Sequence, residues 1–241
     1  SSPAVDVFSY HHYGAASLRC ADGDWWPQTS RQAALAEDWL ASASRGLDYY
    51  RALRDTFEPG TPIWLTETAD TVCGGNPWAA TFLDSFRHLD QLGRLAQAGV
   101  QVVMHNTLAA SDYGLLDENT FQPRPNYWAA LLWRRLMGEA VFDPGVKADA
   151  LHVYAHARRG RAGAMALLVL NLDRKAPRTI ALASPGERCT LTADPLDGGA
   201  VRLNGTALTL GADDALPALT GIPSDAGPMT LPPASISFLA V

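Results

Sequence analysis

The 241-residue chain is poor in cysteine and contains no long apolar segment. Its three cysteines, Cys20, Cys73 and Cys189, are widely spaced and odd in number, so the sequence signals neither a disulfide framework nor a CxxC zinc site. The cysteine pattern does not indicate whether the protein works in an oxidising or a reducing compartment. A membrane-spanning helix is not predicted, because the chain has no run of about 18 apolar residues. The first residues, SSPAVDVFSY, lack the basic and apolar regions of a secretory signal peptide.

The chain also lacks an excess of positive charge. Its formal net charge of −6 and pI near 5.4 argue against a general attraction to nucleic acid or to an anionic membrane. The arginine cluster at 158–161, in ARRGRAG, is predicted to be a solvated hairpin tip. Hydrophobic residues make up 47% of the chain and charged residues 18%, which supplies enough core for one large or two medium globular domains.

The pattern of the sequence changes near residue 145. Before it, short apolar strands alternate with helical patterns, which predicts a parallel sheet covered by crossover helices. After it, short strands and turns predict an antiparallel β-sandwich, with a hairpin at the Asn204-Gly205 turn. We therefore expect an α/β region over 1–144 and a β-sandwich over 145–241. The predicted strands of the first region are 5–13, 61–67 and 100–106, and its predicted helices run from Ser30 to Phe57, from Asn76 (with Pro77 in first position) to Gly99, and from Asn126 to Gly138.

A carboxylate, Glu67, ends the apolar strand PIWLTE. Alternate residues of an extended strand share a face, so we expect Glu67 on the same face as Ile63 and Leu65. Polar side chains at the C-terminal ends of parallel strands are typical of α/β-barrel active sites. The polar tips of the other two strands are His11 and Tyr13, on the face of Val7, and Asn106, on the face of Val102 and Met104.

Several stretches resemble the C-terminal part of glycoside hydrolase family 79, which includes heparanase and β-glucuronidases. These stretches are VDVFSYHHYG, IWLTETADTVCGG, LDQLGRLAQAGVQVVMHNTL and YGLLDENTFQPRPNYWAALLWRRLMG, followed by VRLNGTALTL and LPPASISFLAV. The resemblance implies a retaining glycosidase built on a (β/α)8 TIM barrel with an appended β-sandwich. Residues 1–144 would be the C-terminal portion of the barrel, containing its sixth to eighth strands.

The same resemblance implies roles for individual residues. Glu67 in WLTET matches the catalytic nucleophile of the family, Tyr13 matches a tyrosine that hydrogen-bonds the nucleophile, and His11 matches a histidine lining the sugar site. A retaining mechanism pairs the nucleophile with a second carboxylic acid about 5 to 5.5 Å away. The substrate-binding residues implied are Asn106, where the mammalian enzymes have Gln, and Tyr113 with Gly114, which match contacts to the uronic carboxylate.

The chain departs from the family in two respects. The acid/base Glu of the family lies at the end of the fourth barrel strand, and no part of this chain corresponds to that strand; Asp70, Asp117 and Glu118 do not replace it. The loops AASDY and CGGNPW carry no basic residue, so we expect simple β-glucuronides to be better substrates than highly sulfated heparan. Without the other strands, the chain alone should be inert and should expose apolar strand residues: Val7, Ile63, Leu65 and Val102.

Two other functions compete with this hypothesis. One is a non-catalytic carbohydrate-binding relative of the same fold, and the other is a metal hydrolase that uses His11, His12 and His105, which would need a bend in the first strand. The leading hypothesis requires no cofactor, nucleic acid or membrane. Its partners would be a glucuronic-acid-containing oligosaccharide or glycoside and the N-terminal half of the enzyme, in the same or a separate chain. The resemblance implies a secreted or periplasmic location.

Overall fold

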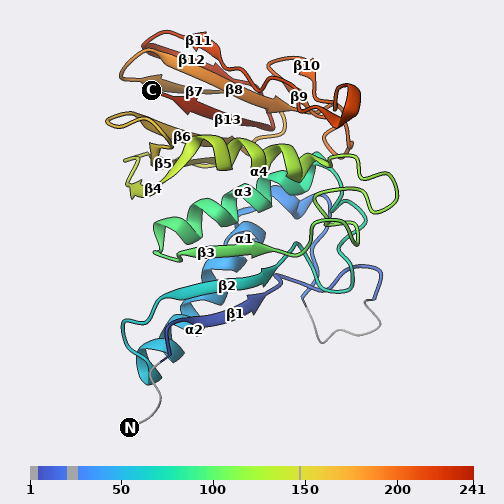
Figure 1. Cartoon of the computed structure of the whole chain (residues 1–241), viewed down its shortest axis with the longest axis vertical. Coiled ribbons are helices and arrows are strands. Elements are labelled where there is room, and N and C mark those ends of the chain that lie inside the picture. The colour runs from blue at the N-terminus through green and yellow to red at the C-terminus, as the bar shows by residue number, and fades with distance from the viewer. Residues whose placement is uncertain (1–4, 21–26, 147) are drawn as a thin grey trace.

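The computed structural model describes residues 5–20, 27–146 and 148–241, which form a small parallel sheet, a layer of helices and an antiparallel region (Figure 1). The parallel sheet has the order β1-β2-β3, and all three strands run in the same direction. This confirms the predicted parallel sheet with crossover helices. The strands are β1 (Phe8–His12), β2 (Ile63–Thr68) and β3 (Val102–His105), and the helices are α1 (Glu37–Leu40), α2 (Ser42–Phe57), α3 (Phe82–Gln97) and α4 (Pro125–Leu136).

Helix α3 lies at the centre of the molecule, between the parallel sheet and α4 with the antiparallel region (Figure 1). It begins at Phe82 rather than at Pro77, so the predicted start was wrong. The side chain of Asn76 does not cap this helix, because its Oδ1 accepts the backbone N–H of Leu18 at 3.1 Å. The C-terminal end agrees with the sequence, since Gly99 follows the helix with a φ of +82°.

Two further helix predictions need correction. The segment 30–57 is not one helix: a 3-10 turn at Ala33–Leu35 and α1 precede α2, and Ser30 Oγ accepts the backbone N–H of Ala33 at 3.2 Å. Helix α4 begins at Pro125, so Asn126 lies inside it and is not its cap, and it ends at Leu136, where β4 follows directly. Gly138 therefore lies in a strand, where a Cβ would come 2.4 Å from Ala157 O.

The antiparallel region consists of an eight-stranded sheet and a two-stranded sheet. The larger sheet has the order β10-β9-β8-β13-β6-β5-β4 with β11 paired to β8, and the smaller sheet pairs β12 with β7. Because β4 pairs with β5, the antiparallel pairing begins before residue 145; the division of the chain into two domains stays a prediction. The strands are β4 (Met137–Phe142), β5 (Leu151–Arg158), β6 (Met165–Asn171), β7 (Arg178–Leu182), β8 (Gly186–Thr192), β9 (Arg202–Leu203), β10 (Thr206–Ala207), β11 (Ile222–Ser224), β12 (Gly227–Leu231) and β13 (Ser235–Ala240).

Apolar side chains cover both faces of the larger sheet. On one face, Leu168 and Phe238 pack against α3 and α4, and on the other, Val169 and Leu239 pack against Leu231 and its neighbours in the two-stranded sheet. The predicted hairpin at Asn204-Gly205 is confirmed, because it joins β9 to β10 with positive φ at both residues. Of the arginine cluster, Arg159 and Arg161 are exposed in the β5–β6 connection, whereas Arg158 ends β5 and pairs with Glu187 at 3.5 Å. In the part of the chain that the structure describes, no helix is long and apolar enough to cross a membrane.

A disulfide joins Cys20 and Cys73, which the sequence did not signal. The two cysteines are 53 residues apart, and the structure brings them together because they lie in the loops that follow the adjacent strands β1 and β2. Cys189 in β8 is buried and free. Disulfides of this kind persist in oxidising compartments.

Candidate active site

An extra residue in β2 decides the direction in which Glu67 points. Leu65 pairs with Tyr10 and Val103, and Thr68 pairs with His12 and His105, so three steps along β2 match two steps along each neighbour. This irregularity is a β-bulge, which re-aims the side chains beyond it. Bulges are frequent next to active sites for this reason.

Because of the bulge, Glu67 does not lie on the face of Ile63 and Leu65, as the sequence had predicted. Leu65 packs with Leu47 of α2 and Leu95 of α3, and Thr68 Oγ1 accepts the Gln91 Nε2 hydrogen from α3, so both side chains face the helices. Glu67, adjacent to Thr68, points to the opposite face of the sheet. Ile63 and Leu65 are 5% and 0% exposed, so the expectation that they would meet water was also wrong; Val7 and Val102 are half-buried.

Four predicted site residues meet on the face of the sheet away from the helices. Tyr13 Oη donates a hydrogen bond to Glu67 Oε1 at 2.7 Å, and Asn106 Nδ2 donates to Tyr13 Oη at 2.8 Å. His11 Nδ1 lies 3.5 Å from Glu67 Oε2. The Glu67 side chain remains 40% exposed and that of His11 60%. The Glu67 carboxylate is therefore contacted by Tyr13 and His11 from the β1 side, is reached by Asn106 only through Tyr13, and is still open to solvent.

The protonation of Tyr13 fixes the direction of this hydrogen-bond chain. Burial raises the pKa of Tyr13, and its hydrogen bond to Glu67 raises it further, while the Asn106 amide acts in the opposite direction. The phenol consequently stays protonated at neutral pH and donates to the carboxylate. Since Asn106 donates to the phenol oxygen, the three groups form an ordered chain from β3 through β1 to β2.

Tyr113 and Gly114 lie in the loop after β3. Tyr113 is 8% exposed, its Oη lies 3.5 Å from Asn106 Nδ2, and its carbonyl accepts a hydrogen from His105 Nε2 at 2.7 Å. A Cβ on Gly114 would come 2.8 Å from Ala110 O, so the tight turn explains the glycine, and its N–H donates to Ser111 O. Tyr113 thus joins the strand-tip cluster, whereas Gly114 shapes the loop.

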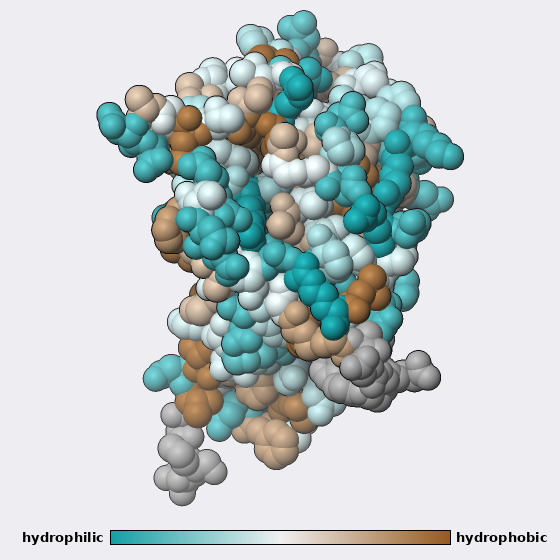
Figure 2. Space-filling model, turned by 90° about the vertical axis from the view of Figure 1, so that its right-hand side faces the viewer, coloured by the Kyte–Doolittle hydropathy of each residue, from teal (hydrophilic) through white to brown (hydrophobic). Residues whose placement is uncertain are grey.

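The other acidic residues that the structure describes in this region do not contact Glu67. Asp117 accepts hydrogen bonds from the backbone of Thr120 and from Arg124, and Glu118 in the same loop is exposed. Asp70 is 1% exposed, and its Oδ2 accepts the backbone N–H of Asn76 at 3.0 Å. Figure 2 views the molecule from the side toward which β1–β3 point, where apolar and polar side chains alternate without a single large patch of either kind.

The three histidines of the metal hypothesis do not converge. His11 faces Glu67, whereas His12 lies against α2, where a Cβ on Gly46 would come 2.5 Å from its ring. His105 stacks edge-on against His88 of α3, on the same side of the sheet as His12. No group of three or more metal-binding side chains was found among the residues that the structure describes.

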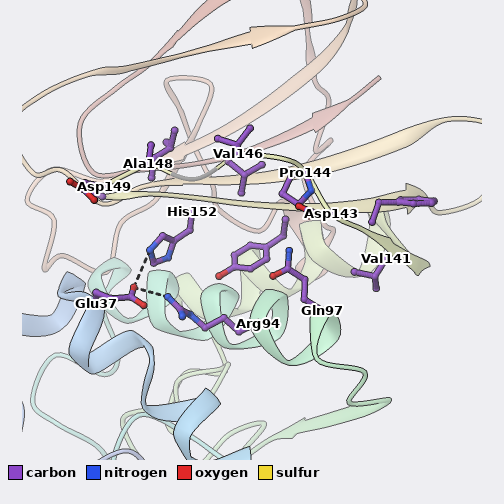
Figure 3. Close-up of a pocket in the computed structure, with 15 residues that line it drawn as sticks. Glu37, Arg94, Gln97, Val141, Asp143, Pro144, Val146, Ala148, Asp149 and His152 are labelled. Carbon is purple, nitrogen blue, oxygen red and sulfur yellow. Dashed lines mark hydrogen bonds and ion pairs between the residues drawn. The ribbon is translucent and has the colours of Figure 1, made fainter. Parts of the chain in front are cut away.

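A cavity lies away from this cluster (Figure 3). It has a volume of about 1000 Å³ between α3, β5 and the residues 143–146 and 148–150. His152 and Arg94 converge on Glu37 along its wall, with His152 Nε2 3.2 Å and Arg94 Nη2 2.7 Å from Glu37 Oε2. Both side chains also contact Asp90, at 2.6 Å each, so they are already paired with carboxylates.

Comparison with curated proteins gives relatives along most of the chain, although no family model matches it. Mouse heparanase (Mus musculus) is 33% identical over 98% of this chain and 46% of its own length. Heparanase-like protein 1 of Arabidopsis thaliana is 41% identical over 52% of this chain and 23% of its own length. Baicalin-β-D-glucuronidase of Scutellaria baicalensis is 29% identical over 93% of this chain and 43% of its own length. The chain spans about half the length of the curated relatives that it matches along most of its residues.

Solved structures share the fold at low sequence identity. A 4-O-α-L-rhamnosyl-β-D-glucuronidase from Fusarium oxysporum superposes with a TM-score of 0.70 at 13% identity, over 97% of this chain and 52% of that chain. A GH51 arabinofuranosidase from Xanthomonas axonopodis pv. citri gives a TM-score of 0.63 at 15% identity, over 98% of this chain and 52% of that chain. These neighbours are TIM-barrel glycoside hydrolases. By sequence the chain is a homologue of the heparanases, the heparanase-like proteins and a plant β-glucuronidase, and its fold is similar to about half of each of these TIM-barrel glycoside hydrolase structures.

Proposed function

We propose that the chain is the C-terminal part of a retaining family 79 glycosidase that acts on β-glucuronides. Residues 1–144 would supply the last strands of the barrel and residues 145–241 the β-sandwich. The observation that supports this most strongly is the hydrogen-bonded group of Tyr13, Glu67 and Asn106 at the C-terminal ends of parallel strands, where TIM-barrel enzymes place their active sites. The homology to heparanases and to a glucuronidase supports the substrate class.

In the first step, a Glu67 carboxylate oxygen forms a bond to the anomeric carbon while the bond from that carbon to the aglycone oxygen breaks. A second carboxylic acid gives its proton to the departing oxygen. In the second step, water attacks the anomeric carbon, its proton passes to the second carboxylate, and Glu67 is released. The Tyr13 hydrogen bond holds one Glu67 oxygen, so the other, Oε2, is the oxygen free to attack.

The remaining residues have supporting roles in this proposal. His11 lines the sugar site beside Glu67 Oε2, and Asn106 orients the Tyr13 phenol. Tyr113 places a second phenol beside Asn106, in position to contact a uronic carboxylate. Gly114 lets the loop turn tightly after Tyr113.

In this proposal the acid/base residue comes from outside the described part of this chain. Asp70 is buried and Asp117 is committed to its own loop, and neither belongs to the Glu67 cluster. The partner we propose is the N-terminal half of the enzyme, in the same or a separate chain, which would complete the barrel and bring the second carboxyl to about 5 to 5.5 Å from Glu67.

The charges around the site favour a substrate with little sulfation. The basic residues nearest the loops are already paired: Arg19 with Asp112, and Arg124 with Asp117 and two backbone carbonyls. Neutralised cations attract a polyanion weakly. We therefore expect a higher kcat/KM for simple aryl β-glucuronides than for highly sulfated heparan, unless the N-terminal half supplies basic subsites.

The test compares the chain alone with the chain supplied together with the N-terminal part of the protein. An aryl β-glucuronide with a poor leaving group should be hydrolysed only by the complete assembly, because general acid catalysis contributes about 10² to 10⁴-fold. Turnover of that substrate by residues 1–241 alone would place the acid within this chain and contradict the proposal. No turnover by the complete assembly would favour the second candidate.

That second candidate is a carbohydrate-binding relative without catalysis. It is favoured by one comparison: inactive heparanase-2 of Mus musculus is 29% identical over 78% of this chain. The two functions differ in the residue at the end of the fourth barrel strand, outside this chain. Glutamate at that position supports hydrolysis, and any other residue supports binding.

A further inference from the structure

A chain of buried polar contacts runs beneath the strand tips, on the face of the sheet opposite Glu67. Arg87 of α3 forms two hydrogen bonds to Asp84, at 2.6 and 2.9 Å, and donates a third to Gln91 Oε1 at 3.1 Å. Asn126 of α4 donates to Asp84 at 2.7 Å. Gln91 Nε2 then donates to Thr68 Oγ1 at 2.9 Å. We call these residues the polar chain: Asn126, Asp84, Arg87, Gln91 and Thr68.

The polar chain ends on the β2 bulge. Thr68 directly follows Glu67, is 1% exposed, and donates its hydroxyl hydrogen to His12 O of β1 at 2.7 Å. The hydroxyl therefore joins three elements: it accepts from α3, belongs to β2 and donates to β1. The backbone on either side of this contact carries the two groups that meet across the sheet, Glu67 and Tyr13.

Stability alone does not account for ionised groups in this position. Asp84 and Arg87 are 3% and 6% exposed, and apolar replacements of a buried ion pair are often at least as stable. One turn further along α3, Leu95 packs against Leu65 of the same strand through purely apolar contacts. Apolar contacts are not directional, whereas a hydrogen bond fixes distance and angle. Directional contacts of this kind meet the bulge at Thr68, at the strand tip.

We propose that Gln91 and Arg87 are positioning residues, which act through Thr68 to hold the β2 bulge and so aim Glu67 at its substrate. The inference rests on the proposed function for its effect on activity. Its structural part does not: the 2.7 Å contact between Tyr13 and Glu67 depends on the bulge whether or not the protein turns over a sugar. A displacement of about 1 Å at a reacting group can cost about 10²-fold in rate.

The experiment uses Gln91→Leu and Thr68→Val in the complete protein, with Thr68→Ser and Gln97→Leu as controls. Thr68→Ser keeps the hydroxyl, and Gln97→Leu makes the same amide-to-apolar change at the exposed C-terminal end of α3. We expect kcat to fall about 10- to 100-fold in the first two variants, with KM within about twofold. The loss should be equal for aryl glucuronides with good and poor leaving groups, because the misplaced group is the nucleophile. The controls should keep wild-type kcat.

Crystal structures of the same variants supply a readout that needs no turnover. In Gln91→Leu and Thr68→Val, the Glu67 carboxylate should move out of hydrogen-bond range of Tyr13. An unchanged Tyr13–Glu67 contact would overturn the inference even if the wild-type protein proved inactive, a result that would itself count against the proposed function. With an active wild type, unchanged kcat in folded Gln91→Leu would also overturn it.

Discussion

The two halves of the interface between the parallel sheet and its helices differ in chemistry. Toward the N-terminal ends of the strands, Leu65 packs with Leu47 and Leu95 in an apolar cluster. Toward the C-terminal ends, the same sheet and the same α3 meet through Thr68 and Gln91 and the groups bonded to them. One strand and one helix thus pass from an apolar interface to a polar one within a single turn.

This difference separates two roles of the interface: stabilising the fold and orienting the Glu67 side chain. The apolar half removes large side chains from water, which stabilises the fold without fixing any one angle. The polar half consists of directional hydrogen bonds beneath Glu67 and Tyr13, the groups proposed to act in catalysis. Burial lowers the pKa of both His12 and His105 to about 4, with Arg87 adding to the effect, so these histidines are neutral at pH 7. Buried polar groups therefore lie directly beneath the candidate site.

The largest effect is expected from Glu67→Gln in the complete protein. The amide cannot form the glycosyl ester, so kcat/KM should fall by about 10⁴-fold or more, or about 5.4 kcal/mol. The unfolding midpoint should change little, because Glu67 is 40% exposed on its open face. The matched control is Glu118→Gln, an exposed glutamate of the neighbouring loop, which should keep kcat/KM within about twofold. An inactive Glu118→Gln beside an active Glu67→Gln would reverse the assignment.

A substitution in the apolar half should have the opposite effect: it should lower stability and leave kcat nearly unchanged. Leu65→Ala leaves a cavity at a side chain with 0% exposure and should reduce the free energy of unfolding by about 2 to 5 kcal/mol. At temperatures where the variant remains folded, its kcat should stay close to that of the wild type. Urea unfolding and steady-state kinetics on the same preparation measure both. If Leu65→Ala lost kcat as strongly as Gln91→Leu, the two halves would not differ in role.

The smallest effect is a change in pH dependence at Asp70. This carboxyl lines a small internal space with His12, Arg87 and Gln91, and burial, followed by repulsion from Asp84, raises its pKa to about 7. The unfolded chain ionises near pH 3.9, so the stabilising contribution of this group is complete below about pH 4 and is lost as the pH rises through 7.

Asp70→Asn removes that titration. Relative to the wild type, the variant should gain up to about 4 kcal/mol of unfolding free energy between pH 4 and pH 8. Both proteins share the histidines, so their titration cancels in the difference. Urea midpoints at the two pH values measure the gain. Parallel pH profiles for the two proteins would show that Asp70 ionises freely in the folded state.

The sequence predicted which residues would meet at the strand tips. Apolar strands that end on polar residues predicted a meeting of Glu67, Tyr13, His11 and Asn106, because the C-terminal ends of parallel strands lie at one edge of a sheet. The direction of Glu67 could not be predicted in this way. Simple alternation holds only for a regular strand, and the extra residue of the β2 bulge becomes visible only when the strands are paired.

The polar chain and the disulfide were missed for related reasons. The polar positions of α3, including Arg87 and Gln91, have the pattern of a solvent-facing helix surface, yet this helix is covered on both sides. Only the layered arrangement reveals that those positions are buried. Cys20 and Cys73 are likewise brought together by the pairing of β1 with β2, which their spacing along the chain does not encode.

The central claim is that Glu67 is the nucleophile and that the polar chain orients it. Covalent trapping tests this claim most directly. A 2-deoxy-2-fluoro-glucuronosyl fluoride should react with the complete protein, with a Glu67 oxygen displacing fluoride from the anomeric carbon. Peptide mass spectrometry should then find the sugar on the peptide that contains WLTET, and Gln91→Leu should be labelled about 10- to 100-fold more slowly than Gln97→Leu. A label on another carboxylate, or equal labelling rates in the two variants, would contradict the account.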